Sequence, residues 1–155
     1  MKIKLFVMDV DGTLTDGCIY VGAEGEVMKA FHVRDGYAIA HTLPAAGIIP
    51  AIITGRTSQI VAARARELRI PEVHQGVSDK LSKLKHLAER YHVTPEEIAY
   101  IGDDVNDLDC MAYAGISACP ADAMEQVAEQ ADYVCTCAGG RGAVREFADE
   151  LVRRG

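Results

Sequence analysis

The chain has neither an excess of basic residues nor an apolar run of membrane-spanning length. Sixteen lysines and arginines stand against twenty-three aspartates and glutamates, so the formal net charge of the 155 residues is −7. This acidic balance argues against nucleic acid and against an anionic membrane surface as the main partner. No stretch approaches the roughly 20 apolar residues that a membrane-spanning helix needs. An anionic ligand would therefore need a local basic cluster or a bound cation.

Patterns typical of disulfide frameworks and leader peptides are absent as well. The five cysteines are odd in number and scattered, which predicts reduced thiols in a cytoplasmic protein. Cys135 and Cys137 have no second Cys or His pair nearby, so we interpret them as strand-end residues rather than metal ligands. The short apolar run near the N-terminus ends in acidic residues, unlike a signal peptide. With no internal repeat or linker, we expect a single domain over residues 1–155.

Short apolar runs alternate with segments of helical periodicity along the chain. The predicted strands cover residues 3–8, 48–54, 98–102, 115–119 and 131–135. The predicted helices cover residues 35–46, 57–68, 78–91, 106–114, 122–130 and 142–153. Such alternation indicates an α/β fold with three layers and a doubly wound, mainly parallel sheet whose strands are buried on both faces. Residues 18–31 interrupt the alternation and predict a protruding β-hairpin.

Polar side chains follow the predicted strands where each strand ends. They are two acids after the first strand, three residues after the second, a lysine at a helix start and three late acids: Asp9, Asp11, Thr54, Gly55, Arg56, Lys80, Asp103, Asp104 and Asp107. In a doubly wound sheet, functional groups gather at the carboxyl ends of the strands. We therefore expect carboxylates, a hydroxyl and an ammonium group to meet at one edge of the sheet.

This set of side chains suits phosphoryl transfer. Carboxylates from two strand ends repel each other unless a hard cation lies between them, and oxygen ligands of this kind suit Mg²⁺. With the metal in place, Asp9 could attack a phosphoryl group as a nucleophile. Asp11 could protonate the leaving alkoxide and then activate water. Lys80 and Thr54 could neutralise and orient the phosphoryl oxygens.

Four short motifs resemble those of the haloacid dehalogenase-like phosphohydrolase superfamily. DVDGTLTDG, ITGR, SDK and GDDVND occur in the superfamily's order, each near the end of a predicted strand or the start of a helix. The resemblance implies that Asp9 accepts the phosphoryl group and that Asp11 is the general acid and base. It also implies that Thr54 and Lys80 contact the phosphate.

The same resemblance implies a set of Mg²⁺ ligands. They would be Asp9, the backbone carbonyl of Asp11, and Asp103, with Asp107 as an auxiliary carboxylate. The residues by themselves leave an alternative open, in which Asp104 and Asp107 only cap the following helix.

A narrower resemblance covers nearly the whole chain. CIYVGAEGEVMKAF, HVRDGYAI, TGRTSQIVAARA, HQGVSDK and AGGRGAVRE are similar to segments of the phosphatase family that acts on 3-deoxy-D-manno-octulosonate 8-phosphate. This family has no cap domain, and it assembles homotetramers through the hairpin corresponding to 18–31, so that a neighbouring subunit completes each site. It implies a small phosphorylated sugar acid as substrate. The substrate contacts that it implies are His32, Val33, Arg34, Asp35, Gly36, Gly55, Arg56 and Arg64.

The chain departs from the family pattern in three places. His32 stands where asparagine is common, Ala40 stands where some members have arginine, and the tail after Arg141 is short. Two structural alternatives also stay open: Arg34 and Asp35 could pair with each other, and the glycines around Arg141 could form a flexible start of the last helix rather than a phosphate or interface site.

Three other functions share some of these residues with an 8-phosphate phosphatase. A phosphatase for nine-carbon sialic-type acid 9-phosphates is the alternative within the class, and Arg56 in TGR favours the eight-carbon acid. A receiver domain of a signalling system uses similar side chains, but its phospho-accepting aspartate follows a middle strand, whereas Asp9 follows the first. A catalytically silent interaction protein is disfavoured because every reacting side chain is present.

Overall fold

The computed structural model describes residues 2–155, in which six parallel strands form one sheet. The strand order is β5 (Glu72–His74), β4 (Ile49–Ile53), β1 (Leu5–Met8), β6 (Ile98–Ile101), β7 (Ile116–Cys119) and β8 (Tyr133–Val134). All five neighbouring pairs are parallel. The chain runs outward from β1 to β5 and then returns to β6 on the other side of β1. The order therefore reverses between β1 and β6, where a doubly wound sheet opens a crevice for ligands.

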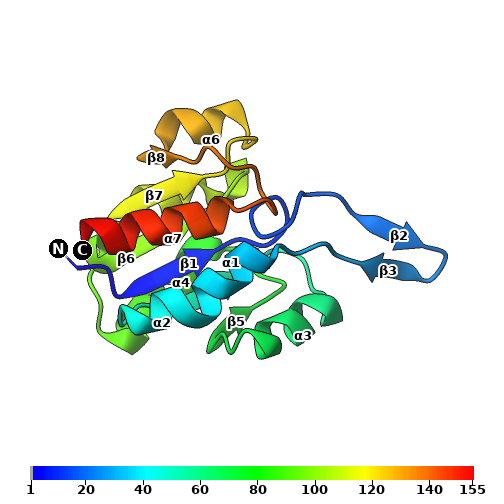
Figure 1. The fold of residues 1–155 in the computed structure, drawn as a ribbon, viewed down its shortest axis with the longest axis horizontal. Helices are drawn as coiled ribbons and strands as arrows, with labels where there is room; N and C mark the ends of the chain where they lie inside the picture. The colour runs from blue at the N-terminus through cyan, green and yellow to red at the C-terminus, as the bar shows by residue number, and fades with distance from the viewer. Residues whose placement is uncertain (1) are drawn as a thin grey trace.

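Helices cover both faces of this sheet, which confirms the three-layer α/β prediction. One face packs against α1 (Val33–Tyr37), a π-helical turn (Ala38–Thr42), α2 (Leu43–Ala45), α3 (Gln59–Glu67) and α7 (Ala143–Arg154). The opposite face packs against α4 (Lys80–Tyr91), α5 (Leu108–Tyr113) and α6 (Glu125–Gln130). Figure 1 shows α7 crossing in front of the strands, with both chain ends at the same side of the molecule.

Strand β1 shows why its sequence is apolar throughout. Phe6 and Met8 belong to the core on the α7 side, whereas Leu5 and Val7 belong to the core on the α4 side. Successive side chains of a strand point to opposite faces, so a strand covered on both faces needs apolar residues at every position. All four are fully buried.

Helix starts follow local capping chemistry, and this accounts for most differences from the predicted bounds. The predicted helix at 35–46 begins earlier, at Val33, because the Nδ1 atom of His32 accepts the backbone N–H of Arg34. Ser58 caps α3 by accepting the N–H groups of Ile60 and Val61. The predicted helices at 106–114 and 122–130 both begin later than predicted: a 3₁₀ turn (Val105–Asp107) precedes α5, and α6 begins at Glu125.

The predicted hairpin is present and protrudes from the body (Figure 1). Strand β2 (Tyr20–Gly22) pairs antiparallel with β3 (Gly25–Met28), so the paired part is shorter than residues 18–31. Gly25 has a φ of 113°, a conformation that strongly favours glycine. Apart from this hairpin and the six-stranded sheet, residues 2–155 form no further sheet. No helix in that range has the length and apolar content of a membrane span.

Phe147 of α7 provides a test of the core. Its buried ring lies 5.5 Å from the ring of Phe6 and 6.1 Å from that of Tyr133, measured between centroids. We expect Phe147→Ala to lower the free energy of unfolding by about 3 to 5 kcal/mol, because it removes this burial and leaves a cavity. Val152→Ala, at a half-exposed position of the same helix, should change it by less than about 0.5 kcal/mol. Urea unfolding measures both, and equal losses would contradict this packing.

Candidate active site

Three buried or half-buried carboxylates meet where β1 and β6 end. Asp9 directly follows β1, and its backbone N–H donates to the carbonyl of Ile101 at the end of β6. Asp103 and Asp107 lie in the loop after β6. Each of the three offers a carboxylate oxygen within 4.8 Å of the others. Because β1 and β6 are neighbours in the sheet, the residues that follow them bring three carboxylates into one small volume.

Lys80 supplies the positive charge of this cluster. It is the first residue of α4, whose start is capped by Asp79. Its Nζ donates to Oδ1 of Asp9 at 3.0 Å and to Oδ1 of Asp107 at 2.9 Å, and the side chain is almost fully buried. Burial by itself would lower the pKa of Lys80, but the two carboxylates outweigh it and raise the pKa above its ordinary value. Lys80 therefore stays charged and links strand β1 to the loop after β6.

Asp107 organises that loop. Its Oδ1 accepts hydrogen bonds from Lys80 and from the hydroxyl of the buried Tyr100. Its Oδ2 accepts the backbone N–H groups of Asp103 and Asp104 at 3.1 and 3.3 Å. Because each oxygen already has two donors, Asp107 fits a supporting role better than that of a direct metal ligand.

Asp104 lies outside the cluster. Its side chain is exposed and accepts the N–H of Val105, so it caps the 3₁₀ turn before α5. The helix-capping alternative therefore describes the contacts of Asp104. Asp107 also belongs to this turn, but it is fully buried and in contact with Lys80.

The cluster has more negative charge than Lys80 can balance. Burial raises the pKa of Asp103 to about 8, and repulsion from Asp9 and Asp107 contributes in the same direction. Burial also raises the pKa of Asp9. A cation among these oxygens would remove the repulsion, and carboxylate oxygens are ligands that Mg²⁺ prefers. Asp9 and Asp103 therefore fit Mg²⁺, while a contribution of the Asp11 carbonyl stays a prediction.

Two glycine positions shape the loop that follows Asp9. Gly12 has a φ of 89°, and a Cβ atom there would lie 1.9 Å from Oδ2 of Asp103. A Cβ on Gly139 would lie 1.9 Å from the carbonyl oxygen of Gly12, and the N–H of Gly140 donates to the carbonyl of Thr13. The glycines before α7 thus pack closely on the loop after β1. This close packing accounts for them better than a flexible helix start.

Thr54 and Arg56 lie at the end of β4. Thr54 is buried, and its N–H donates to the carbonyl of His74 in β5. The side chain of Arg56 is 54% exposed, and its Nε lies 3.9 Å from Oδ2 of Asp11. Arg56 and the exposed Gly55 therefore border Asp11 on the solvent side, where an anionic ligand could reach them.

Asp11 faces the hairpin rather than the carboxylate cluster. Its Oδ1 accepts a hydrogen bond from Lys29, which follows β3, and Lys29 also pairs with Glu26 at 2.9 Å. The sequence reasoning missed Lys29 and Glu26. The one available signal was a lysine within the otherwise apolar run VMKAF. Such a lysine is equally typical of a solvated residue of a hairpin.

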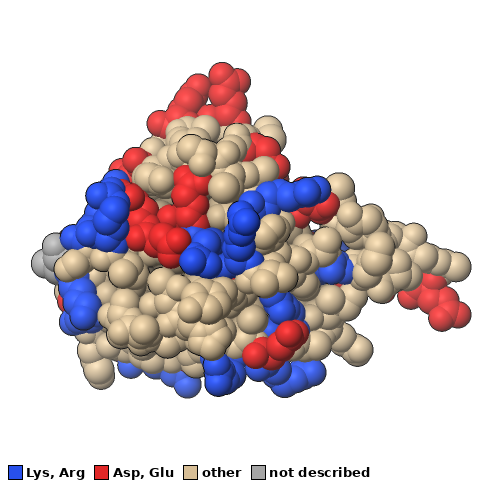
Figure 2. All heavy atoms as spheres, viewed as in Figure 1, with Lys and Arg blue, Asp and Glu red and all other residues tan. Residues whose placement is uncertain are grey.

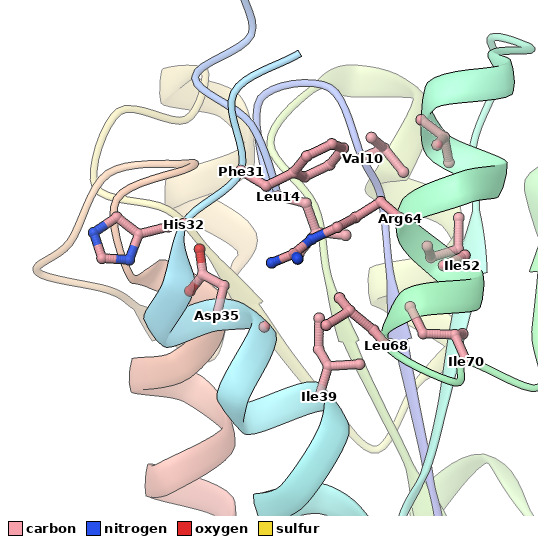
Figure 3. Close-up of a pocket in the computed structure, with 13 residues that line it drawn as sticks. Val10, Leu14, Phe31, His32, Asp35, Ile39, Ile52, Arg64, Leu68 and Ile70 are labelled. Atoms are coloured by element: carbon pink, nitrogen blue, oxygen red, sulfur yellow. The ribbon is translucent and has the colours of Figure 1, made fainter. Parts of the chain in front are cut away.

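Asp35 and Arg64 line a small cavity of about 10 Å³, which is shown in Figure 3. Oδ1 of Asp35 accepts the backbone N–H of Arg145. Among residues 2–155, the buried Oδ2 of Asp35 and the buried Nε of Arg64 have no hydrogen-bond partner. The guanidinium of Arg64 lies over the ring of Phe31, 5.6 Å from its centroid. Within residues 2–155, no hydrogen bond or ion pair joins Asp35 or Arg64 to the carboxylate cluster.

The remaining predicted contacts lie at the start of α1. His32 caps this helix, Gly36 is buried beneath the guanidinium of Arg64, and Val33 and Arg34 are exposed. Across the described part of the chain, no ion pair forms between Arg34 and Asp35, so that structural alternative is not observed. Arg34 is therefore accessible from solvent.

Comparisons with known proteins agree in one family. The profile described as haloacid dehalogenase-like hydrolase matches residues 67–147. The 3-deoxy-D-manno-octulosonate 8-phosphate phosphatase KdsC of Escherichia coli K12 is 47% identical over 151 residues, which cover 97% of this chain and 80% of that protein.

Solved structures show the same likeness. The 3-deoxy-D-manno-octulosonate 8-phosphate phosphatase of Yersinia pestis superposes with a TM-score of 0.94 at 46% identity, covering 97% of this chain and 81% of the other. The Moraxella catarrhalis phosphatase of the same name, solved with magnesium, phosphate and KDO, gives a TM-score of 0.93 at 44% identity, covering 97% and 86%.

The raised pKa of Asp103 predicts a pH-dependent stability. With a chelator present, the melting temperature should fall as the pH rises from about 5 to about 8. The pKa of Asp103 rises from 3.8 to about 8 on folding, so in this window the folded state holds a proton that the unfolded state has lost. Excess Mg²⁺ should raise the melting temperature most at the alkaline end, where no proton competes.

Differential scanning calorimetry at each pH, with chelator or with Mg²⁺, measures this effect. Asp103→Asn is the matched control, because it removes the titrating group and should flatten the pH dependence in chelator. A melting temperature that rises with pH in chelator would contradict the excess of negative charge assigned to this cluster.

Proposed function

The chain belongs to the haloacid dehalogenase-like hydrolase family, and from that membership we propose that it hydrolyses the phosphate ester of 3-deoxy-D-manno-octulosonate 8-phosphate. The observation that supports this most is the 47% identity over 97% of the chain to a phosphatase of that name. The cluster of Asp9, Lys80 and Asp103 at the carboxyl edge of the sheet supplies the groups that the reaction needs.

In the proposed first step, a carboxylate oxygen of Asp9 attacks phosphorus. A bond between phosphorus and Asp9 forms while the bond from phosphorus to the sugar oxygen breaks. Asp11 gives a proton to that oxygen, so that the sugar leaves as an alcohol. Lys80 and Thr54 hold the phosphoryl oxygens and offset their negative charge.

In the proposed second step, water attacks the phosphoryl group on Asp9. Asp11, now a carboxylate, takes a proton from this water, and the bond between phosphorus and Asp9 breaks to release phosphate. When bound by Asp9 and Asp103, Mg²⁺ supplies positive charge that lets an anionic nucleophile approach an anionic ester. The backbone N–H of Gly12 is held by Oγ1 of Thr15, which keeps the loop around Asp9 and Asp11 compact.

The sugar acid requires cationic groups beyond the phosphate. Arg56, which follows β4, and Arg34, in α1, are both exposed. We assign them to the carboxylate and hydroxyl groups of the sugar acid, together with Gly55, Val33 and the half-buried His32. Asp35 and Gly36 are the buried residues of α1, and Arg64 of α3 packs against Gly36. We propose that these three support the segment that presents the substrate contacts.

The hairpin is proposed to assemble a homotetramer in which a neighbouring subunit completes each site. Val21, Val27 and Met28 are 67%, 62% and 55% exposed on it, which is unusual for apolar side chains of a small sheet. Figure 2 shows the hairpin as mostly uncharged, with acidic residues towards its tip. Burying these apolar residues against another copy of the chain would stabilise an otherwise isolated two-stranded ribbon.

We propose a cytoplasmic location for the enzyme. All five cysteines are free thiols, and three of them are buried. Thiols of this kind fit a reducing compartment. The proposed substrate is a small metabolite, so the assignment requires no nucleic-acid or membrane partner.

A substrate panel tests the proposed function. We expect the 8-phosphate of the eight-carbon acid to be hydrolysed with a kcat/KM about tenfold or more above that of nine-carbon 9-phosphates and simple phosphomonoesters, because the sugar contacts add binding in the transition state. Phosphate release under chelator should be lost. Asp9→Asn is the control for the nucleophile and should abolish turnover while the fold persists. Equal rates across the panel would overturn the specific assignment.

Charged substitutions on the hairpin test the assembly. Val21→Glu combined with Val27→Glu should shift the mass measured by light scattering from four chains towards one, because each would bury an unpaired carboxylate in the interface. Val152→Glu places the same change on a half-exposed valine of α7 and is the matched control. A tetramer that persists in the hairpin variant, or a wild-type monomer, would contradict the assembly.

A further inference from the structure

We propose that Lys29, at the base of the β2–β3 hairpin, is a positioning residue that holds the Asp11 carboxyl group so that one defined oxygen exchanges the proton. The proposal rests on the phosphatase function and deepens it. It gives the hairpin a role within its own subunit, in addition to the assembly proposed above.

The side chain of Lys29 is buried although the residue follows a strand of a protruding hairpin. Its side chain is 1% exposed, and lysine is almost never buried this far unless it is paired. Its Nζ donates to Oδ1 of Asp11 and lies 2.9 Å from Oε2 of Glu26. Burial alone would lower the pKa of Lys29, but the two carboxylates raise it overall, so the ammonium persists.

The position of Lys29 is fixed from a third segment of the chain. Oε1 of Glu26 accepts a hydrogen bond of 2.6 Å from the hydroxyl of Ser58. Ser58 is itself the N-terminal cap of α3 and is buried. The ammonium therefore lies at the meeting point of the hairpin, the loop after β1 and the start of α3. This hydrogen-bond network restricts the movement of the Lys29 side chain. The hydrogen bond from Lys29 therefore also restricts the movement of the Asp11 carboxyl group.

The two oxygens of Asp11 consequently differ. Oδ1 is occupied by Lys29, whereas the one polar contact of Oδ2 within residues 2–155 is with the exposed Arg56, at 3.9 Å. A carboxyl oxygen can accept a hydrogen bond from an ammonium group whether or not the other oxygen carries a proton. Lys29 can therefore hold Asp11 in both half-reactions, and Oδ2 is left to give the proton to the sugar oxygen and to take one from water. Lys29 transfers no proton itself.

A purely structural role for Lys29 makes a different prediction. If Lys29 only anchored the hairpin, its loss would disturb the whole site and slow all substrates by a similar factor. If it positions the proton donor, its loss should matter most for a leaving group that needs a proton. The sugar alkoxide is such a group, whereas the p-nitrophenolate ion is a weak base that departs without one. Comparing the two substrates separates the roles.

The test measures kcat/KM of Lys29→Met on 3-deoxy-D-manno-octulosonate 8-phosphate and on p-nitrophenyl phosphate. This parameter reports the steps up to departure of the leaving group, so later hydrolysis of the phosphorylated Asp9 does not mask the effect. General acid catalysis contributes about 10²- to 10⁴-fold to the rate. The ratio compared is kcat/KM for the sugar phosphate divided by kcat/KM for p-nitrophenyl phosphate. We expect misplacement of the acid to lower this ratio by about tenfold or more. Lys29→Arg, which keeps a cation, should restore most of the ratio.

A double substitution shows whether Lys29 acts through Asp11. In an Asp11→Asn background the proton donor is already absent, so adding Lys29→Met should leave the ratio unchanged. A further fall in the ratio would overturn the proposal, and so would equal losses on both substrates in the single variant. Lys4→Met, which removes the ion pair between the half-exposed Lys4 and Glu97, is the matched control and should leave the ratio at the wild-type value.

The hairpin could also lose its fold or its interface when Lys29 is replaced. Circular dichroism and light scattering of each variant detect this, and Lys29→Gln, which keeps a hydrogen-bond donor without the charge, carries the same test if Lys29→Met does not fold. Failure of the wild-type enzyme on the sugar phosphate would overturn the proposed function. A wild-type enzyme that is active, with equal losses on both substrates in the variants, would overturn only the role of Lys29.

Discussion

The buried ammonium group of Lys80 is the interaction on which the rest of the site depends. It contacts Asp9, which follows strand β1, and Asp107, which lies in the loop after β6, and Lys80 itself starts helix α4. Without it, no lysine or arginine of residues 2–155 would pair with any of the three carboxylates. Even with Lys80 present the negative charge is in excess, as the raised pKa of Asp103 shows. This excess is the physical reason why the site fits a divalent cation.

Close backbone packing fixes the positions of the loops that carry the charged groups. Gly12 leaves no room for a side chain next to Asp103, and Gly139 leaves none next to the carbonyl of Gly12. The loop before α7 is held in turn by Glu146, which accepts hydrogen bonds from Thr136 and the N–H of Cys137. A segment more than 120 positions away in the sequence thus supports the loop that presents Asp9.

The location of the site at one edge of the sheet could be predicted, because it follows from the alternation of apolar strands and helices along the sequence. Parallel strands bring their carboxyl ends to one edge, so a motif after each apolar run suffices to place Asp9, Thr54 and Asp103 there. Lys29 and Glu26 could not be found in this way. A hairpin's direction relative to the sheet depends on long-range contacts, and a charged residue in a hairpin is ordinarily solvated. The cavity between Asp35 and Arg64 likewise depends on how α1 packs on α3.

The sequence by itself determined the fold class, the family and the residue types that follow each strand, because strand periodicity and motif order are local properties. Only the tertiary structure decided how those groups are divided. It places Asp107 as a fully hydrogen-bonded support for the loop after β6 and Asp104 as a helix cap. It also separates Asp11 from the carboxylate cluster and joins it to Lys29 of the hairpin. Burial and distance set these roles, and both arise only when segments remote in the chain pack together.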